Sequence, residues 1–310
     1  MRRVEIERKS KVSPEYILEE HLRGIGKPVI LCDATEKWKA LSKWNFEHFA
    51  ERYGSDPVVA WRGLRSGVGK LTTFSTYLQY LDNPSGDLSG IPRGEHADEP
   101  AFERGGEQKP PYYLLDWYAF RQHPELYSDI MPVPSCIPDW TTALSSPLKE
   151  VLERTSLGEF WAIYIGPKDS LSKLHRDFWN THGYLAQIRG RKKAILFSPE
   201  DDDFVYAGGV NPGQPNADLF PLFERATAYE CIIEPGDTLL IPARWWHHVV
   251  GLERSITVSH NFFNEVNFTQ YLTCLMQNLP FITKVIRESP TWCAGLGIDR
   301  EGWRTTDCSQ

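Results

Sequence analysis

The chain has 310 residues, of which 41% are hydrophobic and 24% charged, the composition of a folded globular protein with a substantial core. Its 41 acidic residues outnumber its 34 basic residues, and no basic stripe is visible, so the sequence argues against nucleic-acid binding. The charged start, MRRVEIERKSK, predicts no signal peptide, and no apolar run reaches the ~20 residues that span a bilayer. The net charge of −7 favours solubility first, and it would also suit a basic peptide partner.

The six cysteines are widely spaced and include no CxxC pair. This pattern favours reduced thiols over a disulfide framework, and we therefore expect an intracellular protein, cytoplasmic or nuclear. The cysteines are Cys32, Cys136, Cys231, Cys274, Cys293 and Cys308.

The first third of the chain predicts alternating helices and strands. Ser13 and Pro14 precede EYILEEHLRG, which gives a cap residue, a proline at the first helical position and a terminal glycine. NFEHFAERYG (45–54) repeats this helix signal, with Asn45 as the cap. KPVILC (27–32) and PVVAWRG (57–63) predict short strands. Residues 83–111 are rich in Gly, Pro, Asp and Glu and predict a mobile loop, either a lid or a disordered insertion.

The middle of the chain predicts many short strands separated by Gly, Pro or Asp turns, as in an all-β sandwich or barrel. After Asn264 the pattern becomes helical, first in NFTQYLTCLMQNL and then, beyond Pro280, in FITKVIRE. The predicted strands are FWAIYIG (160–166), GYLAQIRG (183–190), KKAILFSP (192–199), AYECIIEPGD (228–237), TLLIPA (238–243) and RSITVSHNFF (254–263).

The segment KLHRDFW contains two metal-ligating residue types, His175 and Asp177, two positions apart. In an extended strand such residues share a face, so their side chains would converge while Arg176 turns away. IPARWWHHVV could supply a third ligand from His247 or His248. Two histidines and one carboxylate favour Fe(II) with open positions, although zinc could use the same ligands. A surface turn and a core edge with two histidines are the alternatives; the order of the motifs in a β-rich context favours the metal site.

The strand SITVSHNFF predicts one polar face and one apolar face. Thr257, Ser259 and Asn261 alternate with Ile256 and Val258. A polar face on a strand of an otherwise apolar core is typical of a pocket wall.

These motifs resemble the Jumonji C (JmjC) family of Fe(II)- and 2-oxoglutarate-dependent oxygenases. The resemblance rests on LHRDFWNTHGYLAQIRGRKKAILFSPED and IIEPGDTLLIPARWWHHVVGLERSITVSHNFFN, and more loosely on KPVILCDATEKW and PPYYLLDWYAF. It covers the chain from about residue 27 to residue 265. It implies a mainly β fold, with a double-stranded β-helix (a cupin-like jelly roll) at 113–265. Residues 1–112 would form a mixed α/β elaboration, and residues 266–310 a helical segment.

The resemblance also implies a ligand set and a cosubstrate. His175, Asp177 and His247 would hold the iron, and His247 is favoured over His248 because the family's ligand directly follows the tryptophans. Lys192 would pair with the distal carboxylate of 2-oxoglutarate, a charge-assisted contact.

Three further residues match family positions around the cosubstrate, namely Tyr113, Ser172 and Asn261. Each has a structural alternative. Lys192 and its neighbour Lys193 could be a solvated pair, Tyr112 could replace Tyr113 in the pocket, and Ser172 could be a turn residue. Ser172 is followed by a lysine where the family often has proline.

Within the family, the motifs are closest to the protein-hydroxylase branch and similar to the enzyme that hydroxylates a lysine of the translation release factor. The resemblance implies that Fe(II), 2-oxoglutarate and O2 hydroxylate a protein side chain, with lysine favoured, and release succinate and CO2. The alternatives are an N-methyl-lysine demethylase, a small-molecule hydroxylase for which residues 83–111 would form a lid, and a non-catalytic peptide-binding scaffold. The expected partner is a protein or peptide, and the C-terminal helices could form a homodimer or cover the barrel.

Overall fold

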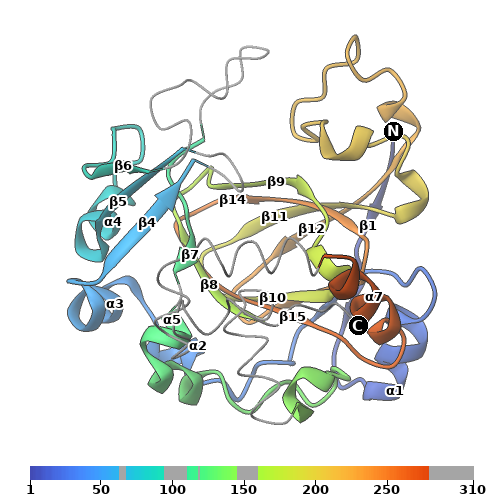
Figure 1. The fold of residues 1–310 in the computed structure, drawn as a ribbon, viewed down its shortest axis with the longest axis horizontal. Helices are drawn as coiled ribbons and strands as arrows, with labels where there is room; N and C mark the ends of the chain where they lie inside the picture. Colours follow the sequence, from blue (N-terminus) through green and yellow to red (C-terminus); the bar gives the residue numbers. More distant parts are fainter. Residues whose placement is uncertain (63–67, 94–109, 118, 145–159, 279–310) are drawn as a thin grey trace, which may run out of the picture.

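The computed structural model describes residues 1–62, 68–93, 110–117, 119–144 and 160–278. Two facing β-sheets form the core (Figure 1). The five-stranded sheet has the order β1 (Arg2–Glu5), β12 (Thr227–Ile233), β11 (Lys192–Phe197), β14 (Trp246–Gly251) and β9 (Leu171–His175). The seven-stranded sheet has the order β2 (Arg8–Lys9), β3 (Val29–Leu31), β13 (Thr238–Ile241), β10 (His182–Arg189), β15 (Ser255–Phe262), β8 (Trp161–Gly166) and β7 (Leu114–Trp117). The predicted jelly-roll core is therefore confirmed.

Apolar side chains from both sheets fill the space between them. Leu185 and Leu239 from the large sheet pack in one cluster with Leu196 and Val249 from the small sheet. The strands β10 and β13 are buried along almost their whole length, because the large sheet is covered on both faces. This explains why they read as continuous apolar runs in the sequence.

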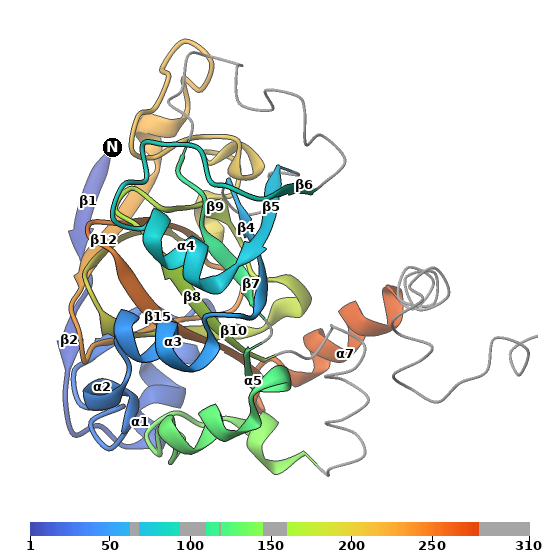
Figure 2. The ribbon, with the colours of Figure 1, turned by 90° about the vertical axis from the view of Figure 1, so that its left-hand side faces the viewer.

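N-terminal helices cover the outer face of the large sheet (Figure 2). Phe49 of α3 (Phe46–Tyr53) and Phe74 of α4 (Phe74–Tyr80) pack in one cluster with Ile163 of β8. The cap prediction holds at α3, where the Asn45 Oδ1 accepts the His48 N–H at 2.7 Å. Shorter helices are α1 (Pro14–Ile17), α2 (Ala40–Lys43) and α5 (Ala119–Gln122).

The first predicted helix differs from a regular α-helix in its second half. Ser13 caps α1 by accepting the Tyr16 N–H, and Pro14 is the first helical residue, as expected. Residues Leu18–Leu22 then continue as a wider π-helical turn, which ends before Gly24 at a φ of +70°. The sequence predicts the helix and its two ends, but not the change in helical pitch between them.

Two strands at the charged N-terminus are not predicted by the sequence. Residues Arg2–Glu5 form β1, which pairs in parallel with β12, and β2 pairs in parallel with β3. A third sheet of β4 (Pro57–Trp61), β5 (Gly69–Thr73) and β6 (Ile91–Arg93) lies beside the core. β6 falls within the predicted loop 83–111, of which residues 94–109 lie outside the described residues.

A single helix of the predicted C-terminal segment belongs to the described residues, α7 (Phe268–Gln277). It packs against the 3₁₀ turn Phe178–Asn180, which directly follows Asp177. The second predicted helical stretch, FITKVIRE, lies outside the described residues. No helix in the described part of the chain is long and apolar enough to cross a membrane.

Candidate metal centre

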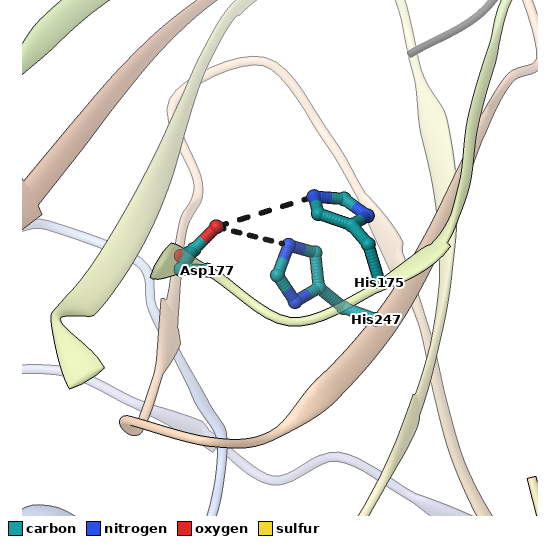
Figure 3. A group of neighbouring side chains, drawn as sticks. All are labelled: His175, Asp177 and His247. Atoms are coloured by element: carbon teal, nitrogen blue, oxygen red, sulfur yellow. Dashed lines mark ion pairs between the residues drawn. The ribbon is translucent and has the colours of Figure 1, made fainter. Parts of the chain in front are cut away.

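Three side chains that are far apart in the sequence meet at one point between the two sheets (Figure 3). His175 ends β9, Asp177 follows two residues later, and His247 lies in β14. Oδ1 of Asp177 lies 4.0 Å from Nε2 of His175 and 3.6 Å from Nε2 of His247. One ligand atom from each residue fits within 4.8 Å of the others. The two histidines, both predicted as ligands, are direct partners in the β9–β14 ladder, so the strand register places them together.

The hydrogen bonds of the two imidazoles fix which ring nitrogen faces the centre. Nδ1 of His175 lies 2.6 Å from the carbonyl oxygen of Lys173, and Nδ1 of His247 lies 3.2 Å from that of Trp245. A carbonyl only accepts, so each Nδ1 carries a proton and each Nε2 is the ring nitrogen that faces Asp177. Backbone carbonyls that orient ligating histidines in this way are the usual arrangement in metal sites.

The carboxylate of Asp177 is held through its other oxygen. Oδ2 accepts a hydrogen bond of 2.9 Å from Nδ2 of Asn261, which also donates to Oγ1 of Thr181 at 3.1 Å. A Cβ at Gly183 would fall 2.8 Å from the same Oδ2, so only glycine leaves room for the carboxylate here. These contacts keep Oδ1 free for the centre.

The neighbours of the ligands point elsewhere, as the sequence predicts for Arg176. Its guanidinium pairs with Asp202 at 2.8 Å and lies over the Trp246 ring. The alternation of β14 directs His248 away from the cluster, and burial lowers the pKa of this imidazole to about 4. The structure therefore brings His247, and not His248, to the other two ligands.

Lys192 is buried in the same pocket. Its side chain is 2% exposed, and Nζ donates to the hydroxyl of Tyr113 at 2.8 Å. Among the described residues no carboxylate pairs with Lys192, and burial lowers the pKa of the ammonium to about 7. A buried cation without a counter-ion is costly, and an anionic group bound beside it would relieve that cost. The solvated alternative, in which Lys192 behaves like Lys193, does not fit this placement.

The remaining predicted cosubstrate residues line the pocket to different extents. Tyr113 and Ser172 line it together with Lys192 and the three ligands, whereas Tyr112 packs beneath the guanidinium of Arg62. Burial raises the pKa of Tyr113 well above its usual range, so its hydroxyl stays protonated. Asn261 contacts the pocket through Asp177.

The polar face predicted for β15 is present, but its residues have different environments. Ser259 lines the pocket, and Asn261 contacts Asp177. The hydroxyl of Thr257 instead donates to Oε1 of Gln187 at 2.8 Å.

The donor set fits a small divalent metal ion and a carboxylate-bearing cosubstrate. Two imidazole nitrogens and one carboxylate oxygen form the facial set that binds iron and leaves positions open. Comparison with known proteins then decides the family: a model of the cupin-like domain family matches residues 14–269.

The chain belongs to the cupin-like family.

Its relatives within this family include oxygenases and demethylases. The chain is 24% identical over 264 residues to arginine-specific demethylase JMJ20 of Arabidopsis thaliana, covering 78% of the chain and 53% of that protein. It is 29% identical over 247 residues to lysine-specific demethylase 8 of Xenopus tropicalis, covering 75% and 47%. It is 25% identical over 275 residues to the 2-oxoglutarate and iron-dependent oxygenase JMJD4 of Danio rerio, covering 82% and 59%. The cupin-like chain thus spans about half the length of these relatives, and the predicted membership of the JmjC oxygenases is confirmed.

Two residues that position the ligands in this cupin-like chain were missed by the sequence reasoning. Both lie in NTHGYLAQ, after the metal motif: Thr181 precedes the predicted strand, and Gly183 is its first residue. The one usable signal is the glycine at the start of an otherwise apolar strand, because glycine in a strand often marks a close approach of another group. The sequence does not show that this group is the carboxylate of Asp177, because the approach depends on the pairing of β10 with β15.

Proposed function

We propose that this chain is an Fe(II)- and 2-oxoglutarate-dependent oxygenase that hydroxylates a protein side chain, with lysine as the target. The proposal rests on two features that lie in the same pocket. At one end, Nε2 of His175, Nε2 of His247 and Oδ1 of Asp177 converge. At the other, Lys192 is buried without a carboxylate partner among the described residues.

The three ligands would hold the iron and leave its remaining positions for 2-oxoglutarate and O2. When bound, the iron would activate O2 for C–H hydroxylation with 2-oxoglutarate as the co-reductant, so that one oxygen atom enters the substrate and the other enters succinate as CO2 is released. The contribution of the chain is to fix this geometry. Asn261 and Gly183 restrict Asp177 to one free oxygen, and the carbonyls of Lys173 and Trp245 orient the imidazoles.

Lys192 would bind the distal carboxylate of 2-oxoglutarate. The anion would favour the protonated ammonium, so binding would raise its pKa from about 7 and take up a proton where the free lysine is neutral. The hydroxyl of Tyr113 already accepts from Nζ, and as a protonated phenol it can donate its own hydrogen to the same carboxylate. Ser172, in the same pocket, would add a second hydroxyl.

The choice of substrate rests on sequence motifs and on the relatives. The motifs resemble the protein-hydroxylase branch, and four relatives are named as lysine-specific demethylases, one from Xenopus tropicalis, one from Danio rerio and two from Arabidopsis thaliana. Demethylation of N-methyl-lysine is therefore the second candidate. The two outcomes need the same metal and cosubstrate residues, and they differ in whether the hydroxylated carbon belongs to the side chain or to an N-methyl group.

The test supplies the full chain with Fe(II), 2-oxoglutarate, O2 and peptides carrying either lysine or N-methyl-lysine. The proposal expects a mass gain of one oxygen atom on unmodified lysine, with matching succinate and without formaldehyde. Formaldehyde from N-methyl-lysine peptides alone would instead establish the demethylase. Succinate formation stimulated only by small metabolites would remove the protein substrate, and no consumption of 2-oxoglutarate with any substrate would leave a binding scaffold.

A further inference from the structure

A second cavity, of about 100 Å³, lies on the opposite face of β10 from the metal centre. His182 and Gly183 are successive residues of this strand, so their side-chain positions face opposite sides. Gly183 lines the metal pocket, whereas His182 lines the second cavity. The same division occurs at the end of β13, where Ile241 lines the first pocket and Pro242 the second. The two cavities share no lining residue.

The imidazole of His182 offers a buried donor to this cavity. The residue is 1% exposed, and its Nδ1 accepts the N–H of Ala243 at 2.9 Å. Burial lowers the pKa of His182 to about 3, so the ring is neutral and its one proton lies on Nε2. Nε2 has no hydrogen-bond partner among the described residues. A buried donor left without an acceptor is costly, so an occupant is expected.

The side chain of Asn264, next to this imidazole, does not supply the acceptor that Nε2 of His182 lacks. Its Oδ1 accepts the Val266 N–H at 3.1 Å, and its Nδ2 is a second buried donor without a partner in the described part of the chain. The Asn264 side chain interacts with the His182 ring in the direction that raises its pKa, but it does not line the cavity, so the buried donor in the cavity wall is Nε2 of His182.

The wall of the second cavity carries positive charge and no negative charge. Arg244 is exposed, lines the cavity and forms no ion pair with a described residue. None of the lining residues is acidic, and Gln270 adds an amide. Arg244 and Asn180, which also lines the cavity, have φ values of +70° and +51°. Non-glycine residues held in this region are strained and are concentrated at ligand clamps and active sites.

We propose that this second cavity binds a small oxyanion, of the carboxylate or phosphate type. One oxygen would accept from Nε2 of His182, and the charge would pair with the guanidinium of Arg244. An oxyanion presents acceptors alone, which matches a wall that presents donors and a cation. A water molecule could satisfy Nε2, but it would give no role to Arg244. The proposal does not rest on the proposed function, because the metal centre lies on the other face of the sheet.

The test titrates the metal-free full chain with inorganic phosphate and, in a separate arm, with acetate. Calorimetry gives the Kd, and the ¹⁵N signals of the His182 ring, assigned with His182→Gln, report its Nε2–H. The same titrations in Lys192→Met exclude anion binding at the buried ammonium of the metal pocket. We expect saturable binding that shifts the His182 signal in both proteins, and the stronger arm identifies the class of oxyanion.

The deciding variant is Arg244→Met, which keeps the bulk of this exposed side chain and removes its charge. It should weaken binding by at least about tenfold, because a charge-assisted contact is lost. The matched control, Arg2→Met in the exposed strand β1, should leave the Kd unchanged. A non-saturable response, an unchanged Kd in Arg244→Met, or loss of binding in Lys192→Met would each overturn the proposal.

Discussion

The burial of Lys192 should affect both the stability of the folded chain and the binding of 2-oxoglutarate. Folding moves its ammonium from water into a pocket where its pKa falls from 10.5 to about 7. The unfolded chain therefore binds more protons than the folded chain between these two values, so the stability of the folded state rises with pH across this window. The destabilisation is fully present below pH 7 and is lost as the pH approaches 10.5.

Lys192→Met should remove this pH dependence. For the parent without 2-oxoglutarate, the free energy of unfolding should rise by up to about 1.4 kcal/mol per pH unit between pH 7 and 10 from this residue alone. The variant should lack that rise and should bind 2-oxoglutarate more weakly. Denaturant unfolding at several pH values measures the first effect, and calorimetry the second. Lys193→Met, which removes a surface ammonium paired with Glu230, is the control. If the free energy of unfolding rises equally steeply with pH in Lys192→Met and in the parent, Lys192 is not the source of the pH dependence.

Asp177→Ala should abolish metal binding and turnover with the fold largely intact. The side chain is partly exposed and contributes one of the three proposed ligands, so its loss should weaken Mn(II) or Fe(II) binding by more than about a hundredfold. Titration of Mn(II) followed by electron paramagnetic resonance measures the affinity, and circular dichroism checks the fold. Asp203→Ala removes an exposed carboxylate and should change neither. Retained affinity in Asp177→Ala would exclude Asp177 as a ligand.

Gly183→Ala tests whether space beside Asp177 is part of the site. The new Cβ would lie 2.8 Å from Oδ2, so the carboxylate must move from its hydrogen bond with Asn261. We expect metal affinity to fall by about 10–100-fold, the usual effect of disturbing a group that orients a ligand. Gly86→Ala, where the Cβ would meet its nearest neighbour at an ordinary 3.8 Å, is the control. If the two variants bind Mn(II) equally well, the close packing at residue 183 has no role in the centre.

At the scale of elements, the sequence predicts those whose pattern is local. The periodicity and turns predict β10, β11, β13 and β15, and the cap residues predict the start of α3. The strand β1 is missed because RRVE has a charged edge-strand composition and gains its partner, β12, from a segment more than 200 residues away. The pairing of β9 with β14 is likewise a tertiary property, although it decides which histidine joins His175.

Asn45→Ala should destabilise the elaboration that covers the large sheet. The amide oxygen of Asn45 satisfies the His48 N–H at the start of α3, and alanine cannot replace it. The expected loss is about 1 kcal/mol in the free energy of unfolding, measured with denaturant. Asn45→Ser, which restores an acceptor, should recover most of the loss, and equal destabilisation by both substitutions would mean that the cap bond is not its source.

At the scale of the whole molecule, the fold class and the family were predictable because the motifs occur in a fixed order that a jelly roll requires. The three proposed ligands and Lys192 could also be predicted from these motifs, and the structure places all four in one pocket. What the sequence could not provide is the orientation of each group. The contact of Asn261 with Asp177, the space at Gly183 and the second cavity behind β10 all depend on the packing of strands distant in the chain.

The homodimer through the C-terminal helices stays a prediction at this scale. Within the described residues, α7 exposes Leu272 and Met276, which could contribute to such an interface. Light scattering coupled to size-exclusion chromatography gives the mass directly. A dimeric mass that becomes monomeric in Met276→Asp would support an α7 interface, whereas a monomeric parent would exclude it.

A structure from crystals grown without oxygen, in the presence of Mn(II) and 2-oxoglutarate, would show directly which side chains hold the metal and the cosubstrate. Anomalous scattering locates the metal independently of the protein density. We expect one strong peak within bonding distance of His175, Asp177 and His247, and a 2-oxoglutarate whose distal carboxylate contacts Nζ of Lys192. A metal bound elsewhere, or a cosubstrate carboxylate that does not reach Lys192, would contradict this expectation.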